Sequence, residues 1–538
     1  RDPLAALTPP ERRLLFASRY HLVTMSKALP KFLLSVDWGN AEAVSEVYKL
    51  LPQWRRPTPG TALQLLGVKF PDPVVRAYAV TCLDDLEDGF LQGYMLQLVQ
   101  ALRLEASADT ALARFLLRRA LGSEAAVGHV FFWYTTAEKH HPVVAHRFQV
   151  LLDVYTEHCA PGHAAGLTQQ AALLDRLHLV AMDINARLPR STPIADVTAD
   201  ARRQLADLAP LLPPALTLPL APDMRVTGLT ASRCRVMKSK KRPLWLEFTV
   251  APTAGGAPAV LFKAGDDLRQ DQLTLQVLRV MDGLWKAAGL DLCMQPYSCV
   301  ATGPDVGLLE VVRPAETIAG IIRQSVTAAS PDASGFKRTA TAAFWAYRRT
   351  DILRAWLEAQ ACNQVAGGME AAERNFARSA AGYCVATYVL GIGDRHNDNI
   401  MLTPDGRLFH IDFGHFLGNF KKKAGFKRER APFVFTKSFA EILGSVDDPR
   451  FAVFLELACK AFLVLRRHTA LLVTLFSLMT TCGIPELRSD DDIRWLRAKL
   501  MIGATDAQAE AKFLSEVDAA MASWATRFND ACHIIANG

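Results

Sequence analysis

The chain has 538 residues, of which 50% are hydrophobic and 21% are charged, and its mean hydropathy is +0.10. These values predict a globular protein of about three to five domains, and they exclude a polytopic membrane protein, a collagen-like chain and a largely disordered one. The net charge of +7 comes from 61 Lys and Arg against 54 Asp and Glu, and residues 421–430 alone hold six basic side chains and one acidic one. A uniformly basic coat for nucleic acid is therefore excluded, whereas one basic segment suits a polyanionic substrate or a lipid surface.

The ten cysteines are scattered, with no CxxC pair and no Cys/His cluster at zinc spacing. We therefore expect reduced, mostly buried thiols in a cytosolic protein. The longest uncharged hydrophobic stretch, 469–484, is shorter than the roughly 20 residues of a membrane span and is expected to be a buried helix. The chain opens with Arg1-Asp2-Pro3, which favours a fragment whose upstream domains are missing.

Residues 1–190 predict helix after helix, because apolar residues recur at helical spacing between short polar or proline-containing breaks. The segments 72–83 and 109–121 illustrate the pattern, and the first is similar to a HEAT unit. No strict period of about 40 residues is visible. We expect a helical solenoid here.

The Leu/Pro/Ala-rich stretch 208–222 cannot continue a helix, and it places the main domain boundary in a linker at 191–222. Beyond it the pattern changes to strands, with a predicted hairpin at 244–250 and 259–263 around a Gly255-Gly256 turn. An amphipathic helix at 266–288 follows, then strands at 292–297 and 307–312, a flexible insertion at 325–343, and a mainly helical remainder. This pattern predicts a small sheet-rich lobe at 223–312 followed by a larger helical lobe at 313–538, which is the order of the lobes in a kinase-like fold.

The most informative segment, 391–415, has the sequence GIGDRHNDNIMLTPDGRLFHIDFGH. It predicts a polar loop, a strand at 400–402, a Pro-Asp-Gly turn, and a strand at 408–411 that ends at Asp412. Such a hairpin can hold Asp394, Asn399 and Asp412 around one point.

Phosphoryl transfer from ATP needs this set: a carboxylate at the acceptor, amide and carboxylate ligands for Mg²⁺, and a cation on the phosphates. Asn399 follows Asp394 by five residues, which is the spacing of the protein-kinase catalytic loop. The triplet order is reversed, however, because Asp394-Arg395-His396 stands where a protein kinase has His-Arg-Asp. A lone DFG triplet is a weak signal, but the two motifs across one hairpin strongly favour a kinase.

The motifs GIGDRHNDNIM and FHIDFGH closely resemble the catalytic and metal-binding loops of the class I phosphoinositide 3-kinases. The resemblance extends to residues 234–248, 260–271 and 381–390, and the N-terminal residues 2–4 and 112–118 look like the family's helical domain. It implies an α+β fold in which an α-helical solenoid domain precedes a bilobal protein-kinase-like catalytic domain. The phosphate-loop segment and DRHNDN look most like the gamma catalytic subunit, while residues 416–420 look more like the delta or beta forms.

The resemblance assigns roles to single residues. The loop at 237–241 matches the family's phosphate-binding loop, with Ser239 placed to donate to a phosphate oxygen, and Lys263 matches the lysine on the ATP phosphates. The resemblance assigns Asp394 and His396 to contacts with the acceptor hydroxyl and the γ-phosphate. Which of the two accepts the hydroxyl proton stays open, because a histidine can act as a base or bind phosphate as a cation. Other residues that the resemblance assigns to ATP binding are the inner-pocket residues Asp271 and Tyr297, the hinge residues Glu310 and Val312, and Met237 and Trp245 on either side of the adenine ring. It assigns Asn399 and Asp412 as the Mg²⁺ ligands.

Three functions fit a kinase-like chain. A lipid kinase would transfer the ATP γ-phosphate to the 3-hydroxyl of phosphatidylinositol 4,5-bisphosphate, whereas a related Ser/Thr protein kinase would share both motifs. The basic segment after DFG favours the lipid, because cation clusters suit inositol phosphates better than a peptide hydroxyl. A non-catalytic nucleotide-binding scaffold is disfavoured by the complete catalytic set. The predicted headgroup-binding residues are Lys421, Lys422, Lys423, Lys427, Arg428 and Arg430.

The family resemblance also implies partners and a location. It implies a cytoplasmic enzyme recruited peripherally to the plasma membrane, with a regulatory subunit, a Ras-type GTPase and G-protein βγ as partners. The last segment matches the family at Trp524 and Phe528 but has Asp530 and Ala531 where the gamma form's aromatic pair would fall. We expect that segment to engage membranes weakly, because an aspartate costs desolvation free energy at an interface where an aromatic ring is favourable.

Overall fold

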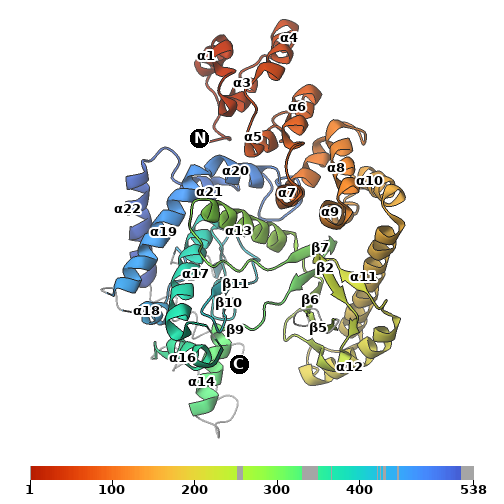
Figure 1. The fold of residues 1–538 in the computed structure, drawn as a ribbon, viewed down its shortest axis with the longest axis vertical. Coiled ribbons are helices and arrows are strands. Elements are labelled where there is room, and N and C mark those ends of the chain that lie inside the picture. The colour runs from red at the N-terminus through yellow and green to blue at the C-terminus, as the bar shows by residue number, and fades with distance from the viewer. Residues whose placement is uncertain are drawn as a thin grey trace.

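The computed structural model describes residues 2–250, 258–329, 349–364, 366–420, 422–423, 426–427, 432–444 and 448–522. A helical domain is followed by a small sheet and a larger helical region, which confirms the expected α+β architecture (Figure 1). None of the described helices is long and apolar enough to cross a membrane. The eight cysteines whose side chains are described are all free, and seven of them are buried, as expected for reduced thiols.

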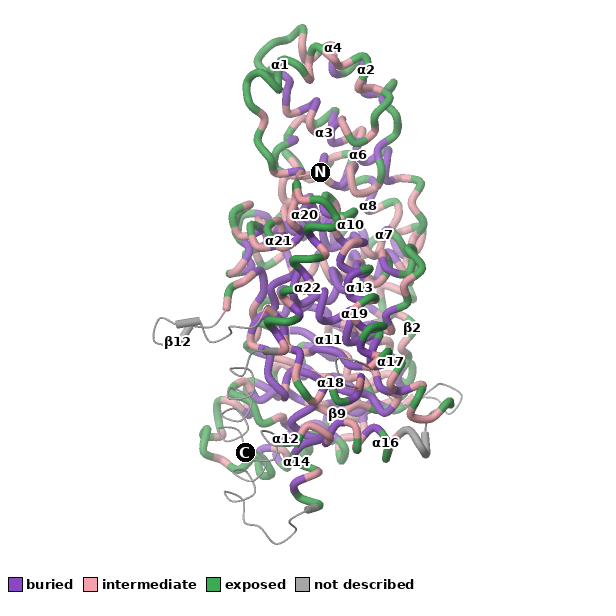
Figure 2. The backbone as a smooth tube through the Cα atoms, turned by 90° about the vertical axis from the view of Figure 1, so that its left-hand side faces the viewer, coloured by how far each residue is buried: buried purple, intermediate pink, exposed green. Residues whose placement is uncertain are grey.

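The N-terminal region is a run of helices. Most of the buried side chains between Leu29 and Leu167 share one hydrophobic core, whereas those between Leu173 and Ile184 pack in a second core with the small sheet. Its helix starts follow the sequence: Asp72 caps α6 by accepting from the amides of Val74 and Val75 at 3.0 Å each, and Thr110 caps α8. The outermost helix α1 buries no residue, in line with the exposed end of the molecule in Figure 2. The helices are α1 (Pro9–Ala17), α2 (Arg19–Leu22), α3 (Leu29–Leu33), α4 (Ala41–Leu50), α5 (Pro59–Gln64), α6 (Pro73–Leu83), α7 (Asp88–Ala101), α8 (Ala111–Gly122), α9 (His129–Glu138), α10 (Ala145–His158) and α11 (Pro161–Arg187).

The predicted linker at 191–222 is only partly a linker. Helix α12 (Ile194–Leu208) occupies its first half, because Val197, Ala201 and Leu205 recur at helical spacing and are buried. The helix ends just before the proline-rich stretch, as the sequence indicates. Short strands β1 (Leu216–Leu218) and β2 (Ala221–Val226) then pair antiparallel.

The central sheet is antiparallel, with strand order β3-β5-β6-β8-β7 and with β4 paired to β5. The predicted strands at 244–250, 259–263 and 307–312 are confirmed within two residues, whereas 292–297 is not a strand and β7 begins only at Cys299. The Gly255-Gly256 turn lies outside the described residues. The strands are β3 (Gly228–Leu229), β4 (Arg235–Val236), β5 (Leu244–Thr249), β6 (Ala259–Ala264), β7 (Cys299–Gly303) and β8 (Val306–Glu310).

Helix α13 (Arg269–Ala287) runs between the sheet and the C-terminal helices (Figure 1), and it confirms the helix expected at 266–288. Its buried side includes Leu278, Met281 and Trp285. The indole Nε1 of Trp285 donates to the carbonyl of Ala461 at 2.9 Å, which ties the helix to α19 (Pro449–Arg467). The helix therefore joins the sheet to the C-terminal region.

The C-terminal region packs around the buried helix α17 (Gly368–Leu390), which lies against α19 along much of its length. The insertion expected at 325–343 is helical in its first residues, because α14 continues to Ala329; residues 330–343 lie outside the described residues. The buried helix expected at 469–484 is confirmed only as far as Ser477. The remaining elements are β9 (Glu316–Thr317), α14 (Ile318–Ala329), α16 (Ile352–Gln364), β10 (Ile400–Leu402), β11 (Leu408–His410), β12 (Lys422–Lys423), β13 (Phe426–Lys427), α18 (Lys437–Leu443), α20 (Thr469–Ser477), α21 (Arg494–Lys499) and α22 (Asp506–Ala522).

Candidate functional site

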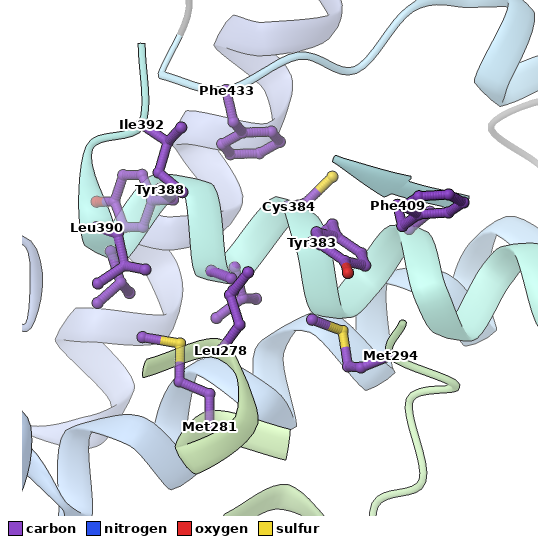
Figure 3. Close-up of a cluster of buried hydrophobic side chains, with 14 of the residues drawn as sticks. Leu278, Met281, Met294, Tyr383, Cys384, Tyr388, Leu390, Ile392, Phe409 and Phe433 are labelled. Carbon is purple, nitrogen blue, oxygen red and sulfur yellow. The ribbon is translucent and has the colours of Figure 1, made fainter. Parts of the chain in front are cut away.

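The polar loop 391–399 begins where α17 ends. Side chains of α17 such as Tyr383, Cys384 and Tyr388 lie in a buried cluster with residues of α13, so this helix is a fixed support (Figure 3). Gly391 ends the helix with a left-handed φ of 58°, and a Cβ there would lie 2.5 Å from the Gly418 amide nitrogen. Only glycine meets both conditions without strain.

The loop brings the three residues of the DRHxxN pattern together. Asn399 donates from its side-chain Nδ2 to the carbonyl of Asp394 at 3.0 Å and lies 3.3 Å from Nε2 of His396. The Asn399 amide also donates to the His396 carbonyl at 2.8 Å. His396 and Asn399 are buried, while the Asp394 side chain remains partly exposed. The loop therefore holds the side chains of His396 and Asn399 together and ties Asn399 to the backbone of Asp394.

The predicted hairpin carries the second carboxylate. Strands β10 and β11 pair antiparallel with Ile400 opposite His410, and the Ile411 amide donates to the Asn399 carbonyl at 3.0 Å. Asp412 follows directly and is exposed. Asp394 and Asp412 have left-handed φ angles of 57° and 60°, which for residues other than glycine cost about 1–3 kcal/mol each. The surrounding contacts must hold both positions against this cost.

Arg395 supplies much of that restraint, and the sequence analysis gave it no role. Its side chain is buried and donates to the carbonyls of Gly393 at 2.9 Å and Ile411 at 2.7 Å, and also to the carbonyl of Asp412. One guanidinium thus ties the loop of Asp394 to the strand end that carries Asp412. The Asp-Arg-His triplet could have indicated this role, because an arginine between two functional residues offers five hydrogen-bond donors in a fixed geometry.

The residues after Asp412 are fixed by two further side chains that the sequence analysis missed. Gln270, at the start of α13, donates from Nε2 to the Phe413 carbonyl at 2.9 Å. Glu486 accepts from the Phe416 amide at 2.8 Å and lies 2.7 Å from Nδ1 of His415. Glu486 is 74 residues from Asp412 in the chain, so no local pattern could have identified it.

Lys263 lies near the end of β6, opposite Gly307 of β8. Burial alone would lower the pKa of Lys263, but the carboxylates of Asp271, Asp412 and Asp266 together outweigh it and raise that pKa above its ordinary value. Lys263 is therefore held as a cation by the combined charges of Asp271, Asp412 and Asp266.

Asp271 and Tyr297 form the buried wall next to Lys263. Burial raises the pKa of Asp271, although Lys263 opposes the effect, and the Asp271 carboxylate accepts from the Phe413 amide at 2.9 Å. Burial also raises the pKa of Tyr297, and the negative charges of Asp271 and Asp412 raise it further. The expected inner-pocket residues therefore lie in the electrostatic surroundings of Lys263 and Asp412.

The residues expected around adenine lie on neighbouring parts of the sheet. Trp245 on β5 is held by a hydrogen bond from Nε1 to Glu247 at 2.7 Å and by the Arg235 guanidinium, which lies 4.1 Å from its ring centre. Glu310 ends β8, where its carboxylate accepts a hydrogen bond from the Ser298 amide at 2.8 Å. Val312, two residues further along the chain, is half-buried. Met237 and Ser239 lie in the turn between β4 and β5.

The predicted headgroup-binding side chains lie outside the described residues. The backbone of Lys422–Lys423 pairs with that of Phe426–Lys427 as strands β12 and β13, but the side chains of Lys422, Lys423 and Lys427 are not described. Lys421, Arg428 and Arg430 are not described at all, and neither is the C-terminal segment with Trp524, Phe528, Asp530 and Ala531.

The oxygen atoms of Asn399 and Asp412 suit a magnesium ion. The described residues contain no group of three or more His, Cys, Asp or Glu side chains that could hold a metal by themselves. Mg²⁺ does not require one, because it is usually held by one or two protein oxygens together with substrate phosphates and water. An exposed carboxylate beside an amide on the same hairpin fits that pattern.

Comparison with known proteins gives two family matches. Residues 258–489 match the model "Phosphatidylinositol 3- and 4-kinase", and residues 1–168 match "Phosphoinositide 3-kinase family, accessory domain (PIK domain)". The chain is 41% identical over 532 residues to "Phosphatidylinositol 3-kinase 2" of Dictyostelium discoideum, which covers 99% of this chain and 27% of that protein. It is 40% identical over 538 residues to "Phosphatidylinositol 3-kinase 1" of the same organism, or 100% of this chain and 32% of that protein. The chain thus spans about a third or less of these relatives.

Proposed function

We propose that this chain transfers the γ-phosphate of ATP to the 3-hydroxyl of phosphatidylinositol 4,5-bisphosphate. The matches of residues 258–489 and 1–168 to the kinase and accessory-domain models support the proposal. The observation that carries the proposal is the geometry around Arg395, which joins the loop of Asp394, His396 and Asn399 to Asp412. Lys263 on β6 stays protonated because the charges of Asp271 and Asp412 raise its pKa.

The proposed chemistry follows from these charges. Lys263 binds the phosphates of ATP, and the bond from the γ-phosphorus to the β-phosphate oxygen breaks as the lipid oxygen attacks. The hydroxyl proton passes to Asp394 or His396, both of which stand at the acceptor side. Asn399 and Asp412 would hold Mg²⁺, which when bound neutralises charge on the phosphates. The trisphosphate lipid is the product.

The acceptor and the partners rest on the family resemblance and the basic segment. Cations at 421–430 would bind the 4- and 5-phosphates through charge-assisted hydrogen bonds. A related Ser/Thr protein kinase would share the catalytic loop but would have no use for such a segment. By the same resemblance we propose a class I catalytic subunit, gamma-like with some delta- or beta-like features, that acts in the cytoplasm and is recruited peripherally to the plasma membrane. Its proposed partners are a regulatory subunit, a Ras-type GTPase and G-protein βγ.

The catalytic assignment is tested with Lys263→Met and Asp412→Asn, each of which removes one charge on opposite sides of the phosphates. We expect both to abolish transfer from labelled ATP to lipid vesicles while circular dichroism stays unchanged. Lys286→Met is the matched control, because Lys286 is an exposed lysine of α13 paired only with Asp282 on the same helix. Near-parental turnover by either site variant would refute the assignment.

The acceptor is tested separately by neutralising Lys421–Lys423, Lys427, Arg428 and Arg430. We expect a large loss on vesicles of phosphatidylinositol 4,5-bisphosphate, a much smaller loss on phosphatidylinositol at matched vesicle charge, and unchanged basal ATP hydrolysis. Each Lys or Arg near an anionic leaflet contributes about 1 kcal/mol regardless of headgroup. An equal loss on both lipids would therefore show general membrane attraction only, and efficient phosphorylation of a peptide hydroxyl instead of lipid would favour the protein-kinase alternative.

A further inference from the structure

A cavity of about 560 Å³ lies between the helical domain and the C-terminal region, away from the candidate active site. One wall comes from residues between Asp2 and Gln64, and the other comes from the junction of α19 and α20 and from the loop 500–503. Figure 1 shows α5 beside α20 at this junction, and Gly60 of α5 packs closely on Leu471 of α20. Both domains therefore contribute to one cavity, which is partly open to solvent.

Positive charge converges on this cavity from both walls. Lys27 and Lys31 line it from the helical domain, and Arg466 and Arg467 line it from the end of α19. Burial lowers the pKa of the lining residue His468, and the positive charges of Lys27 and Arg467 lower it further. The cations of the two domains thus act on the same point.

The acids that line the cavity are already engaged. Asp2 pairs with Arg497 at 2.5 Å, and Asp506 lies 3.4 Å from Arg466. Lys27 and Arg467 form no ion pair with any acid in the described part of the chain. Lys27 and Arg467 are both exposed, so two like charges face one solvent-accessible cavity, and both would attract an anion bound between them.

Backbone donors add to these charges. Helix α20 begins at the cavity, its first residues Thr469, Ala470 and Leu471 all line it, and no side chain caps this helix end. The first amide groups of a helix lack internal acceptors and favour negative charge. The space is also much larger than one phosphate group requires and falls within the range of small-molecule pockets.

We propose that this cavity binds a soluble small molecule with two or more phosphate groups, which bridges the helical domain and the C-terminal region. Lys27 contacts it from one side, next to Lys31, whose ammonium also donates to the Ala5 carbonyl at 2.5 Å. Arg467 with the amides of α20 contacts it from the other side. The ligand pairs with these cations, and its binding holds the two domains together. The proposal does not rest on the proposed kinase activity.

The test uses tripolyphosphate as the probe and calorimetric titration as the readout. The chain carries Lys263→Met and the buffer contains EDTA, so that the candidate active site contributes little heat. Lys27→Gln/Arg467→Gln removes one cation from each wall. Lys49→Gln/Arg494→Gln is the matched control, because it removes one exposed cation from each domain away from the cavity. We expect the cavity variant to bind about tenfold or more weakly, since two charge-assisted hydrogen bonds are lost, and the control to bind within about twofold.

Hydrogen exchange supplies an independent readout on the chain with its cavity residues intact. Tripolyphosphate should slow exchange of the amides at 469–471 and 500–503 and raise the melting temperature, because a ligand that binds only the folded state stabilises it. Inorganic sulfate at equal ionic strength should do neither to the same extent. Equal affinities of the cavity variant and the matched control, or no exchange protection at these amides, would overturn the proposal.

Discussion

Arg395 provides the most direct test of how the candidate active site is held together. Its guanidinium is buried and donates to the carbonyls of Gly393, Ile411 and Asp412. Hydrogen bonds to a charged group contribute about 1.5–3 kcal/mol each, and a buried acceptor left without a donor loses a similar amount. Water entering the vacated space recovers part of this, so we expect Arg395→Met to destabilise the loop locally by about 3–4 kcal/mol.

The loss should be visible where the loop amides exchange with solvent. The amides of Asn399 and Ile411 are hydrogen-bonded in the intact loop, and a cost of about 3–4 kcal/mol lowers their protection by two to three orders of magnitude, or about tenfold per 1.4 kcal/mol. Turnover should fall about a hundredfold with a smaller change in the KM for ATP, because Lys263 lies on the other lobe. Arg407→Met is the control, since Arg407 is on the same hairpin and is half exposed beside Asp405. Unchanged protection and turnover in Arg395→Met would refute the restraining role.

Three further predictions concern single contacts. Gly391→Ala should abolish turnover and lower the melting temperature, because a side chain is disfavoured at a left-handed φ of 58° and the added Cβ would lie 2.5 Å from the Gly418 amide nitrogen. Gly166→Ala is the control, because Gly166 lies on an open helix surface. His410→Phe should make the protein more resistant to acid, because burial and Arg395 hold the pKa of His410 well below 6.5 in the folded state. The folded state therefore loses stability as the pH falls below the pKa of this histidine in the unfolded chain, by about 2 kcal/mol between pH 7.5 and 5.0. An unchanged acid sensitivity of the melting temperature would contradict this. Gln97→Leu should lower the free energy of unfolding in denaturant by about 1–3 kcal/mol, because its buried partner Gln276, at 2.6–2.9 Å, loses its hydrogen bonds to Gln97. A smaller loss in the double variant Gln97→Leu/Gln276→Leu would identify the unpaired Gln276 amide as the cause.

The parts of the fold that the sequence predicted are those set by local pattern. The hairpin 400–411 follows from two short apolar runs around a Pro-Asp-Gly turn, and its register brings Asp412 next to the loop of Asp394. Helix α13 follows from its 3.6-residue period in the same way. A site built on one hairpin and its preceding loop therefore follows from local sequence pattern alone.

The errors arise where tertiary packing decides. The apolar run 292–297 suggests a strand, but Met294 and Tyr297 bury their side chains in the core, while the chain finds no ladder partner before Cys299. The Ser/Thr/Ala composition after residue 325 suggests a flexible insertion, yet Val326 is buried and α14 continues to Ala329. In both segments burial against distant residues overrides local preference.

The roles of Gln270 and Glu486 depend on distant contacts for the same reason, and they show how the site is fixed in space. Helix α13 contacts three parts of the molecule. It contacts the helical domain through Gln276 and the C-terminal helices through Trp285. It contacts the residues after Asp412 through the consecutive residues Gln270 and Asp271, which hold the Phe413 backbone. The strained position of Asp412 is therefore held by α13 and Arg395 together, and α13 links that position to the interface with the helical domain.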